Sequence, residues 1–232
     1  MLSLSGLNQF YGESHTLWDV SFEVPEASCV CLMGRNGVGK TTTLKCIMGL
    51  LRLRSGEILL RGEPISGEPA ESRAARRIGY VPQGREIFAR LSVEENLKLG
   101  LVANPGARGR RAMDRVLETF PVLKDMLRRR GGDLSGGQQQ QLAFGRALVL
   151  EPELLILDEP TEGIQPNIVH EIGDTIRRLN RDLGLTVLLV EQKLPLARRV
   201  ADRFHILDKG RSVAEGPIEA LDDDVVRRHL TV

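Results

Sequence analysis

The sequence is poor in cysteine, and this argues against a disulfide-stabilised fold. Its 232 residues include only Cys29, Cys31 and Cys46, which are too few and too close to apolar runs to form a disulfide framework. Cys29 and Cys31 alternate along an expected strand and point the same way, as buried reduced thiols do. A metal-binding pair is disfavoured because no second cluster of Cys or His accompanies them.

The sequence also lacks long apolar runs and a strong net charge. No run approaches the ~20 apolar residues of a membrane-spanning helix, and the start, Met1–Leu4, does not resemble a signal peptide. The 32 Lys and Arg residues are balanced by 31 Asp and Glu, which disfavours a nucleic-acid binder. The basic runs Arg108–Arg111 and Arg128–Arg130 are interpreted as solvated surface. We therefore expect a soluble protein that reaches a membrane only through a partner.

Strands and helices alternate along most of the chain. The strand Ser28–Met33 leads into a glycine-rich turn and then into a helix that carries apolar residues as far as Leu51. Residues from about 84 to 150 have a helical pattern, interrupted by a loop at Asn104–Gly109, and are interpreted as an inserted subdomain. Strands that alternate with helices predict an α/β fold with a parallel sheet covered on both faces, in a single domain over residues 1–232.

The remaining elements are expected from apolar runs and turn residues. They are a strand at Trp18–Val24, a strand pair around Glu57–Arg61 and Ile78–Pro82, strands at Leu154–Leu157 and Thr186–Val190, a helix at about Ile168–Leu183, and a hairpin over Phe204–Glu215 that turns at Lys209 and Gly210.

The glycine-rich turn matches the pattern G-x-x-x-x-G-K-[ST] between a strand and a helix. Its glycines allow successive backbone N–H groups to face one anion, and the following helix adds its positive dipole end. In such a loop the Lys reaches the β- and γ-phosphates, and the first Thr ligates Mg²⁺. The predicted ATP-binding residues are Gly34, Arg35, Asn36, Gly37, Val38, Gly39, Lys40, Thr41 and Thr42.

Two carboxylates follow the apolar run Leu154–Leu157. The carboxyl end of a buried parallel strand opens onto the crevice in which such sheets bind ligands. Asp158 is therefore predicted to hold Mg²⁺, directly or through water. Glu159, one residue later, is placed to act as the base that polarises an attacking water. The alternative is a pair of solvated acids, which the phosphate loop makes less favourable.

A second glycine-containing string, Leu134–Gln138, precedes another helix. Ser135 and Gln138 form a capping box, and two glycines in a first helical turn each cost roughly 1 kcal/mol of helix propensity. Glycines with this unfavourable helix propensity are not expected at a segment that only begins a helix. We expect the backbone here to approach an anion, with Ser135, Gly136, Gly137 and Gln138 as further ATP-binding residues.

Together these strings resemble the nucleotide-binding domain of ABC transporters, over essentially the whole chain. The resemblance rests on Gly34–Thr42, Gln83, Leu134–Gln138 and Leu154–Glu159, in that order. It implies a P-loop NTPase core with a parallel sheet, an N-terminal antiparallel β region and the inserted helical subdomain. It also implies that two such chains pack head to tail, with each ATP between the phosphate loop of one chain and Leu134–Gln138 of the other.

The resemblance assigns two further residues. Tyr11 matches the aromatic residue that stacks on adenine, against the alternative of ordinary strand packing. Gln83 matches the glutamine that contacts Mg²⁺ and the attacking water and that links to the membrane partner.

The sequence departs from the family pattern at two positions. Gln192 stands where most members have a His after the last core strand, and it can donate a hydrogen bond to the γ-phosphate without carrying charge. Gln165 stands where an Asp is common. None of the four His residues replaces the missing one; all four are expected on surfaces or strand edges. These departures put the speed of turnover in doubt, not nucleotide binding.

Both departures resemble the ATPases of importers for branched-chain amino acids, short amides and urea, with Val81–Phe88 and Glu162–Pro166 closest to the urea type. That resemblance implies permease subunits, a second ATPase chain (the same or different), a periplasmic solute-binding protein acting indirectly, and a peripheral position on the cytoplasmic face of the inner membrane. Two alternatives stay open: an export ATPase for lipid or polysaccharide, and a soluble ABC-type ATPase acting on nucleic acid or ribosomes. The second is disfavoured because Lys40 and Ser135 are too close in sequence to enclose a coiled coil.

Overall fold

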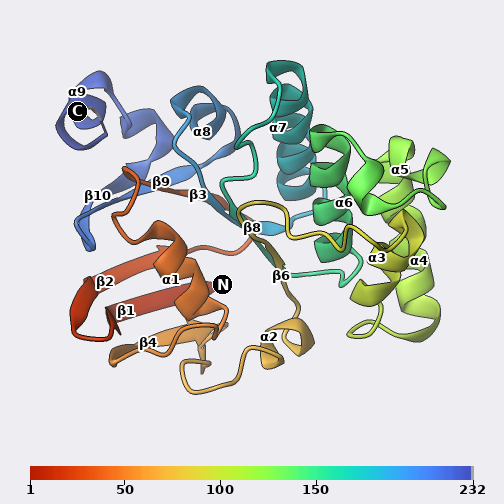
Figure 1. Cartoon of the computed structure of the whole chain (residues 1–232). Coiled ribbons are helices and arrows are strands. Elements are labelled where there is room, and N and C mark those ends of the chain that lie inside the picture. The colour runs from red at the N-terminus through yellow and green to blue at the C-terminus, as the bar shows by residue number, and fades with distance from the viewer. Residues whose placement is uncertain (231–232) are drawn as a thin grey trace.

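The computed structural model describes residues 1–230, which form two sheets with helices around them (Figure 1). The N-terminal sheet is antiparallel and has the strand order β2-β1-β4-β5. The second sheet has the order β10-β9-β3-β8-β7-β6 and is parallel except for the β9–β10 hairpin. The strands are β1 Leu2–Tyr11, β2 Ser14–Val24, β3 Cys29–Met33, β4 Ser55–Leu60, β5 Glu63–Pro64, β6 Ile78–Val81, β7 Leu154–Asp158, β8 Thr186–Val190, β9 Arg203–Asp208 and β10 Arg211–Pro217.

Three central strands of the parallel sheet are buried along their whole length. Every residue of β3, β7 and β8 is buried, because helices cover one face, and the antiparallel sheet together with the helix Lys40–Ile47 covers the other. This explains why these strands read as continuous apolar runs. Cys29 and Cys31 are buried free thiols on β3, as predicted, and burial raises the pKa of both.

The helices divide into two groups in Figure 1. Helices α3 to α6 gather at one side, on the sheet edge made by β6, and include the segment interpreted as a subdomain. The others lie around the two sheets. Their bounds are α1 Lys40–Ile47, α2 Ser72–Ala75, α3 Val93–Gly100, α4 Gly106–Thr119, α5 Pro121–Asp125, α6 Gly136–Leu148, α7 Pro166–Arg181, α8 Leu194–Val200 and α9 Asp223–His229, with 3₁₀ turns at Gly131–Asp133 and Ile218–Ala220. Within residues 1–230, none of the helices combines the length and apolar character needed to cross a bilayer.

Four expectations about these elements are wrong. The strands near Glu57 and Ile78 do not pair, since β4 joins the antiparallel sheet and β6 the parallel one. Leu51 lies beyond α1, which ends at Ile47 ahead of Gly49 (φ +69°). The expected loop at Asn104–Gly109 is largely the first turn of α4. His205 is buried on β9, an interior strand, rather than exposed or at an edge.

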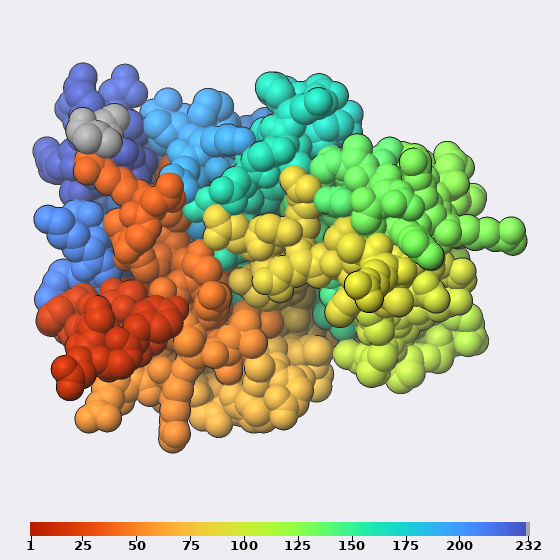
Figure 2. Space-filling model, in the orientation of Figure 1, coloured from red at the N-terminus to blue at the C-terminus, as the bar shows by residue number. Residues whose placement is uncertain are grey.

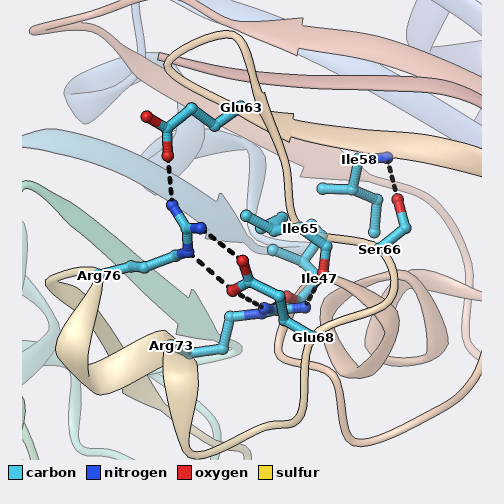
Figure 3. Close-up of polar contacts among 8 residues, drawn as sticks. All are labelled: Ile47, Ile58, Glu63, Ile65, Ser66, Glu68, Arg73 and Arg76. Atoms are coloured by element: carbon cyan, nitrogen blue, oxygen red, sulfur yellow. Dashed lines mark hydrogen bonds and ion pairs between the residues drawn. The ribbon is translucent and has the colours of Figure 1, made fainter.

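A fully buried arginine joins the end of α1 to the segment after β5 (Figure 3). Arg73 Nε donates to the carbonyl oxygen of Ile47 at 2.7 Å, and Nη2 donates to that of Ile65 at 2.8 Å. Nη1 lies 3.4 Å from Glu68, which also pairs with Arg76. A cation that bonds the last carbonyls of a helix satisfies groups that have no partner inside the helix. Arg73 therefore anchors the helix that begins with the phosphate loop.

Replacing Arg73 with Met is expected to lower the free energy of unfolding by about 3 kcal/mol, because two buried carbonyl oxygens lose their donors. Urea denaturation followed by circular dichroism measures this loss. Arg76→Met is the matched control, since it contacts the same Glu68 from a more exposed position, and we expect a smaller loss. Equal losses in the two variants would show that the buried carbonyl contacts of Arg73 stabilise the fold no more than the exposed ion pairs of Arg76.

Candidate functional site

The phosphate loop connects β3 to α1 and depends on glycine at two positions. Gly34 has φ +145°, and a Cβ there would lie 2.4 Å from the backbone oxygen of Leu207. Gly39 has φ +107°, and a Cβ there would lie 2.7 Å from the Leu17 side chain. A side chain at either position would force the loop away from its neighbours. The loop therefore has one compact shape, with its middle residues, Arg35, Asn36 and Gly37, exposed.

The Lys40 side chain lies inside this loop. Its Nζ donates to the carbonyl oxygens of Gly34 and Arg35, both at 2.9 Å, and lies 3.5 Å from Glu159 Oε1. Only 5% of the residue is exposed. A buried ammonium group held by carbonyls and one carboxylate is a fixed positive charge at the base of the loop, which suits an anionic ligand.

Asp158, at the end of β7, lies against the start of α1. Thr41 Oγ1 donates to Asp158 Oδ1 at 3.3 Å, while the buried Oδ2 has no hydrogen-bond partner among the described residues. Burial raises the pKa of Asp158 to about 6, against the lowering effect of the Thr41 hydrogen bond. A buried carboxylate with an unpaired oxygen beside a hydroxyl is the oxygen-ligand chemistry that Mg²⁺ prefers. Within residues 1–230, no group of three or more acidic, His or Cys residues is arranged to hold a metal ion by itself.

Glu159 and the phosphate loop line one cavity of about 270 Å³. It is lined by Asn36, Gly37, Gly39, Lys40, Thr41, Thr42, Gln83 and Glu159. Glu159 has a left-handed backbone (φ +46°), which is uncommon for a residue other than glycine and often accompanies function. Gln83 reaches the same cavity from the end of β6, and its amide donates to Glu162 Oε2 at 2.8 Å. The cavity thus brings together residues from three distant parts of the sequence.

Gln192 closes the site from the segment after β8. Its Nε2 donates to Glu159 Oε1 at 2.6 Å and to Asn36 Oδ1 at 2.7 Å. One neutral amide therefore joins the expected base to the tip of the phosphate loop. Gln165, the other departure, is exposed just before α7 and has no capping hydrogen bond to that helix.

Sequence reasoning missed Glu191, which holds the Gln192 segment in place. Its buried carboxylate accepts from Thr161 Oγ1 at 2.7 Å and from the backbone N–H groups of Gln192 and Lys193 at 2.8 and 3.0 Å. An acid directly after a buried strand was the available signal, since Asp158 follows its own strand in the same way.

Replacing Gln192 with Ala is expected to lower the rate of ATP turnover about tenfold and to change nucleotide affinity little. The lost amide contacts the expected base, and a hydrogen bond to a charged group contributes about 1.5–3 kcal/mol. Steady-state kinetics give the kcat and KM that separate the two effects. Gln192→His, which keeps a donor, should recover part of the rate. Equal losses of rate and affinity would indicate that Gln192 only supports the shape of the site.

Tyr11 lies at the end of β1, next to the start of α1. Its hydroxyl is 3.5 Å from Thr42 Oγ1 and 48% of the residue is exposed. An exposed ring beside the phosphate loop is available for stacking, so packing inside the strand does not account for it. The stacking role stays a prediction.

The Leu134–Gln138 element does not join this cavity within one chain. Ser135 caps α6 with the predicted box: its Oγ accepts from Gln138 N, and the Gln138 side chain accepts from Ser135 N. Helix α6 belongs to the helical group and lies apart from α1 in Figure 1, and no residue of the element lines the cavity. Packing also gives the two glycines a reason of their own, because a Cβ on Gly136 would lie 3.3 Å from Arg85 and one on Gly137 would lie 3.0 Å from Ile168.

Comparisons with known proteins agree with this geometry. The family model described as "ABC transporter" matches residues 17–162. The chain is 44% identical to the high-affinity branched-chain amino acid transport ATP-binding protein BraG of Pseudomonas aeruginosa (92% of this chain, 91% of BraG). It is 39% identical to the probable branched-chain amino acid transport ATP-binding protein LivF of Archaeoglobus fulgidus (95% and 94%). The lipopolysaccharide export ATP-binding protein LptB of Escherichia coli is 36% identical (98% and 95%).

Solved structures show the same fold. An ATP-binding subunit of an ABC transporter superposes with a TM-score of 0.83 at 32% identity, over 98% of this chain and 92% of that one. A dimeric ATP-binding cassette in a post-hydrolysis state, bound to ADP and Pi, gives a TM-score of 0.84 at 26% identity, over 94% and 99%. The predicted P-loop core with its parallel sheet and N-terminal antiparallel sheet is confirmed by these likenesses.

Proposed function

Since the chain belongs to the ABC transporter family and is an ATPase of that family, we propose that it is the energising subunit of an importer. The observation that carries the energising role is one cavity that unites the phosphate loop, the acidic end of β7 and Gln83, and the relatives BraG and LivF support the importer role. Its walls hold a fixed cation, a candidate base and backbone N–H groups, which phosphoryl transfer to water requires.

Each residue has a separate part in the reaction. Lys40 and the loop amides hold the β- and γ-phosphates and offset their charge. Glu159 orients and polarises the attacking water, accepting its proton at the carboxylate. Gln192 keeps Glu159 turned toward the loop through the 2.6 Å hydrogen bond. Its second N–H, which is donated to Asn36 at 2.7 Å, would turn to the γ-phosphate when the nucleotide binds. Tyr11 stacks on the adenine ring.

Asp158, Thr41 and Gln83 would hold Mg²⁺ with the nucleotide. The ion would supply positive charge that offsets the charge developing on the phosphate oxygens. The unpaired oxygen of Asp158 supports this assignment.

The functional unit is proposed to be a head-to-tail dimer. Ser135–Gln138 presents a capped helix start but lines no part of the phosphate-loop cavity formed by the described residues of its own chain. A second chain, identical or different, would place this element over the phosphate loop, as the dimeric state of a structural relative supports.

Permease subunits would bind in the groove between the core and the helical group. Figure 2 shows the segment after β6, in yellow, lying across this boundary. The groove encloses about 620 Å³, and its lining includes three exposed apolar residues, Phe88, Leu99 and Val102. Exposed apolar surface of this kind supports a protein partner, and such a partner would hold the chain on the cytoplasmic face of the inner membrane.

The cargo is proposed to be a branched-chain amino acid, supported by the relatives BraG and LivF. The strings Val81–Phe88 and Glu162–Pro166 support urea or short amides as a second candidate. Both candidates can be tested after the chain is purified with its permeases from native membranes and reconstituted into proteoliposomes. Uptake of leucine and of urea is then measured with ATP enclosed in the lumen, on the side of the membrane where this subunit lies. A solute-binding protein should be needed for uptake. ATP-dependent efflux of lipid or polysaccharide instead of uptake would contradict the importer proposal.

A further inference from the structure

An aromatic stack lies on the surface of the β1–β2 hairpin that carries Tyr11. The Phe10 and His15 rings are parallel, with centroids 4.0 Å apart and an interplanar angle of 10°. His15 stacks in turn on Trp18 at 3.6 Å, and the Arg211 guanidinium lies 4.7 Å from the Trp18 ring centroid. The stack connects β1, β2 and β10. None of the roles proposed above for the site residues accounts for it.

Two irregularities of β2 create this stack. His15 and Trp18 are three positions apart, so in a regular strand their side chains would point to opposite faces. The register of β1 on β2 skips Thr16, because Gln9 pairs with Leu17 and Phe10 pairs with His15. Such a bulge re-aims the side chains around it. A further register shift lies between Leu7 and Gln9, and Asp19 in that region has a left-handed backbone.

The same bulge contacts the phosphate loop. A Cβ on Gly210 would lie 2.1 Å from the Thr16 carbonyl oxygen, and one on Gly39 would lie 2.7 Å from Leu17. Gly210 also forms hydrogen bonds with both β2 and the phosphate loop: its carbonyl oxygen accepts from Trp18 N at 2.8 Å, and its N–H donates to Val38 O at 3.0 Å. The backbone beneath the stack is thus tied to the loop that binds phosphate.

Tyr11 is the residue that this arrangement positions. It follows Phe10 directly in β1, so its ring leaves the opposite face of the strand, toward Thr42. A two-residue turn with Gly12 at φ +60° then leads to Ser14, the partner of Tyr11 in the register. Any tilt of the Phe10–His15 pair moves Tyr11 relative to the phosphate loop.

We propose that the stack of Phe10, His15, Trp18 and Arg211 is a positioning element that holds Tyr11 at a fixed place over the base of the bound nucleotide, in register with the phosphate loop. This inference rests on the proposed ATP-binding function and deepens it. Pre-organising a stacking ring lowers the ordering cost of binding. The stack therefore acts on the base half of the nucleotide, and the phosphate half binds without it.

The test compares binding of MgATP with binding of magnesium tripolyphosphate, which has no base, by calorimetry on the full chain. We expect His15→Ala to weaken MgATP binding about tenfold, which is roughly 1.4 kcal/mol, and to leave tripolyphosphate binding unchanged. His15→Phe keeps a stacked ring and should restore ATP affinity. Phe10→Leu opens the stack at its other end and should behave like His15→Ala. Val213→Ala, an exposed apolar change on β10 outside the stack, is the matched control.

Unchanged ATP affinity in both His15→Ala and Phe10→Leu would overturn the inference, as would equal weakening for ATP and tripolyphosphate or a failure of His15→Phe to restore binding. The proposed function fails separately, if the wild-type protein does not bind MgATP.

Discussion

Replacing Glu159 with Gln is expected to lower steady-state ATP hydrolysis by a factor of about 10²–10⁴, the usual contribution of a positioned general base. The amide keeps the shape of the side chain but cannot accept the proton of the attacking water. ATP binding should persist, because Lys40 and the loop amides are unchanged, and the protein should accumulate as an ATP-bound dimer. A coupled assay for phosphate release and size-exclusion chromatography with MgATP measure the two effects.

Glu171→Gln is the matched control, because Glu171 is an exposed acid on α7 away from the cavity. It should leave both readouts unchanged. Hydrolysis at the wild-type rate by Glu159→Gln would show that Glu159 is not the base, and another group near the cavity would have to take that role.

Lys40→Ala should weaken MgATP binding about 100-fold, or roughly 2.7 kcal/mol, since it removes the charged partner of the phosphates at a buried position. Fluorescence titration with a labelled ATP analogue measures the affinity. Lys45→Ala tests the specificity of the effect, because Lys45 lies on the same helix but outside the cavity. Equal affinities for Lys40→Ala and the wild-type protein would show that Lys40 of the phosphate loop does not bind the phosphates.

The sequence allowed the phosphate loop and the acidic strand end to be predicted because both depend on neighbours in the chain. A glycine-rich turn between a buried strand and a helix has few possible shapes, and two carboxylates after an apolar run must lie at the edge of the sheet. The capping box of Ser135 and Gln138 is equally local, and the structure confirms it.

Contacts between distant segments could not be predicted in the same way. The strand near Glu57 and that near Ile78 belong to different sheets, and no local pattern records which partner a strand chooses. The amide of Gln192 reaches both Asn36 and Glu159 only after three separate loops have packed together. The aromatic stack depends on bulges in β2, which shift the alternation that a strand pattern assumes.

The helical group around α6 was predicted as an inserted subdomain. Its helices lie together in Figure 1, but its division from the core as a subdomain, like the roles of the individual site residues, stays a prediction that the variants above address.

Disulfide cross-linking between two singly substituted chains tests whether the phosphate loop of one chain faces the capped helix of another. Asn36→Cys in one chain and Ser135→Cys in the other would be mixed with MgATP in a Glu159→Gln background and oxidised; the three native thiols are buried and give little background. We expect a covalent dimer only when both substituted chains and MgATP are present. The dimer should be absent when either chain is oxidised alone. If no cross-link forms between the two chains with MgATP, the phosphate loop of one chain does not face the capped helix of another, and the proposed dimeric site is wrong.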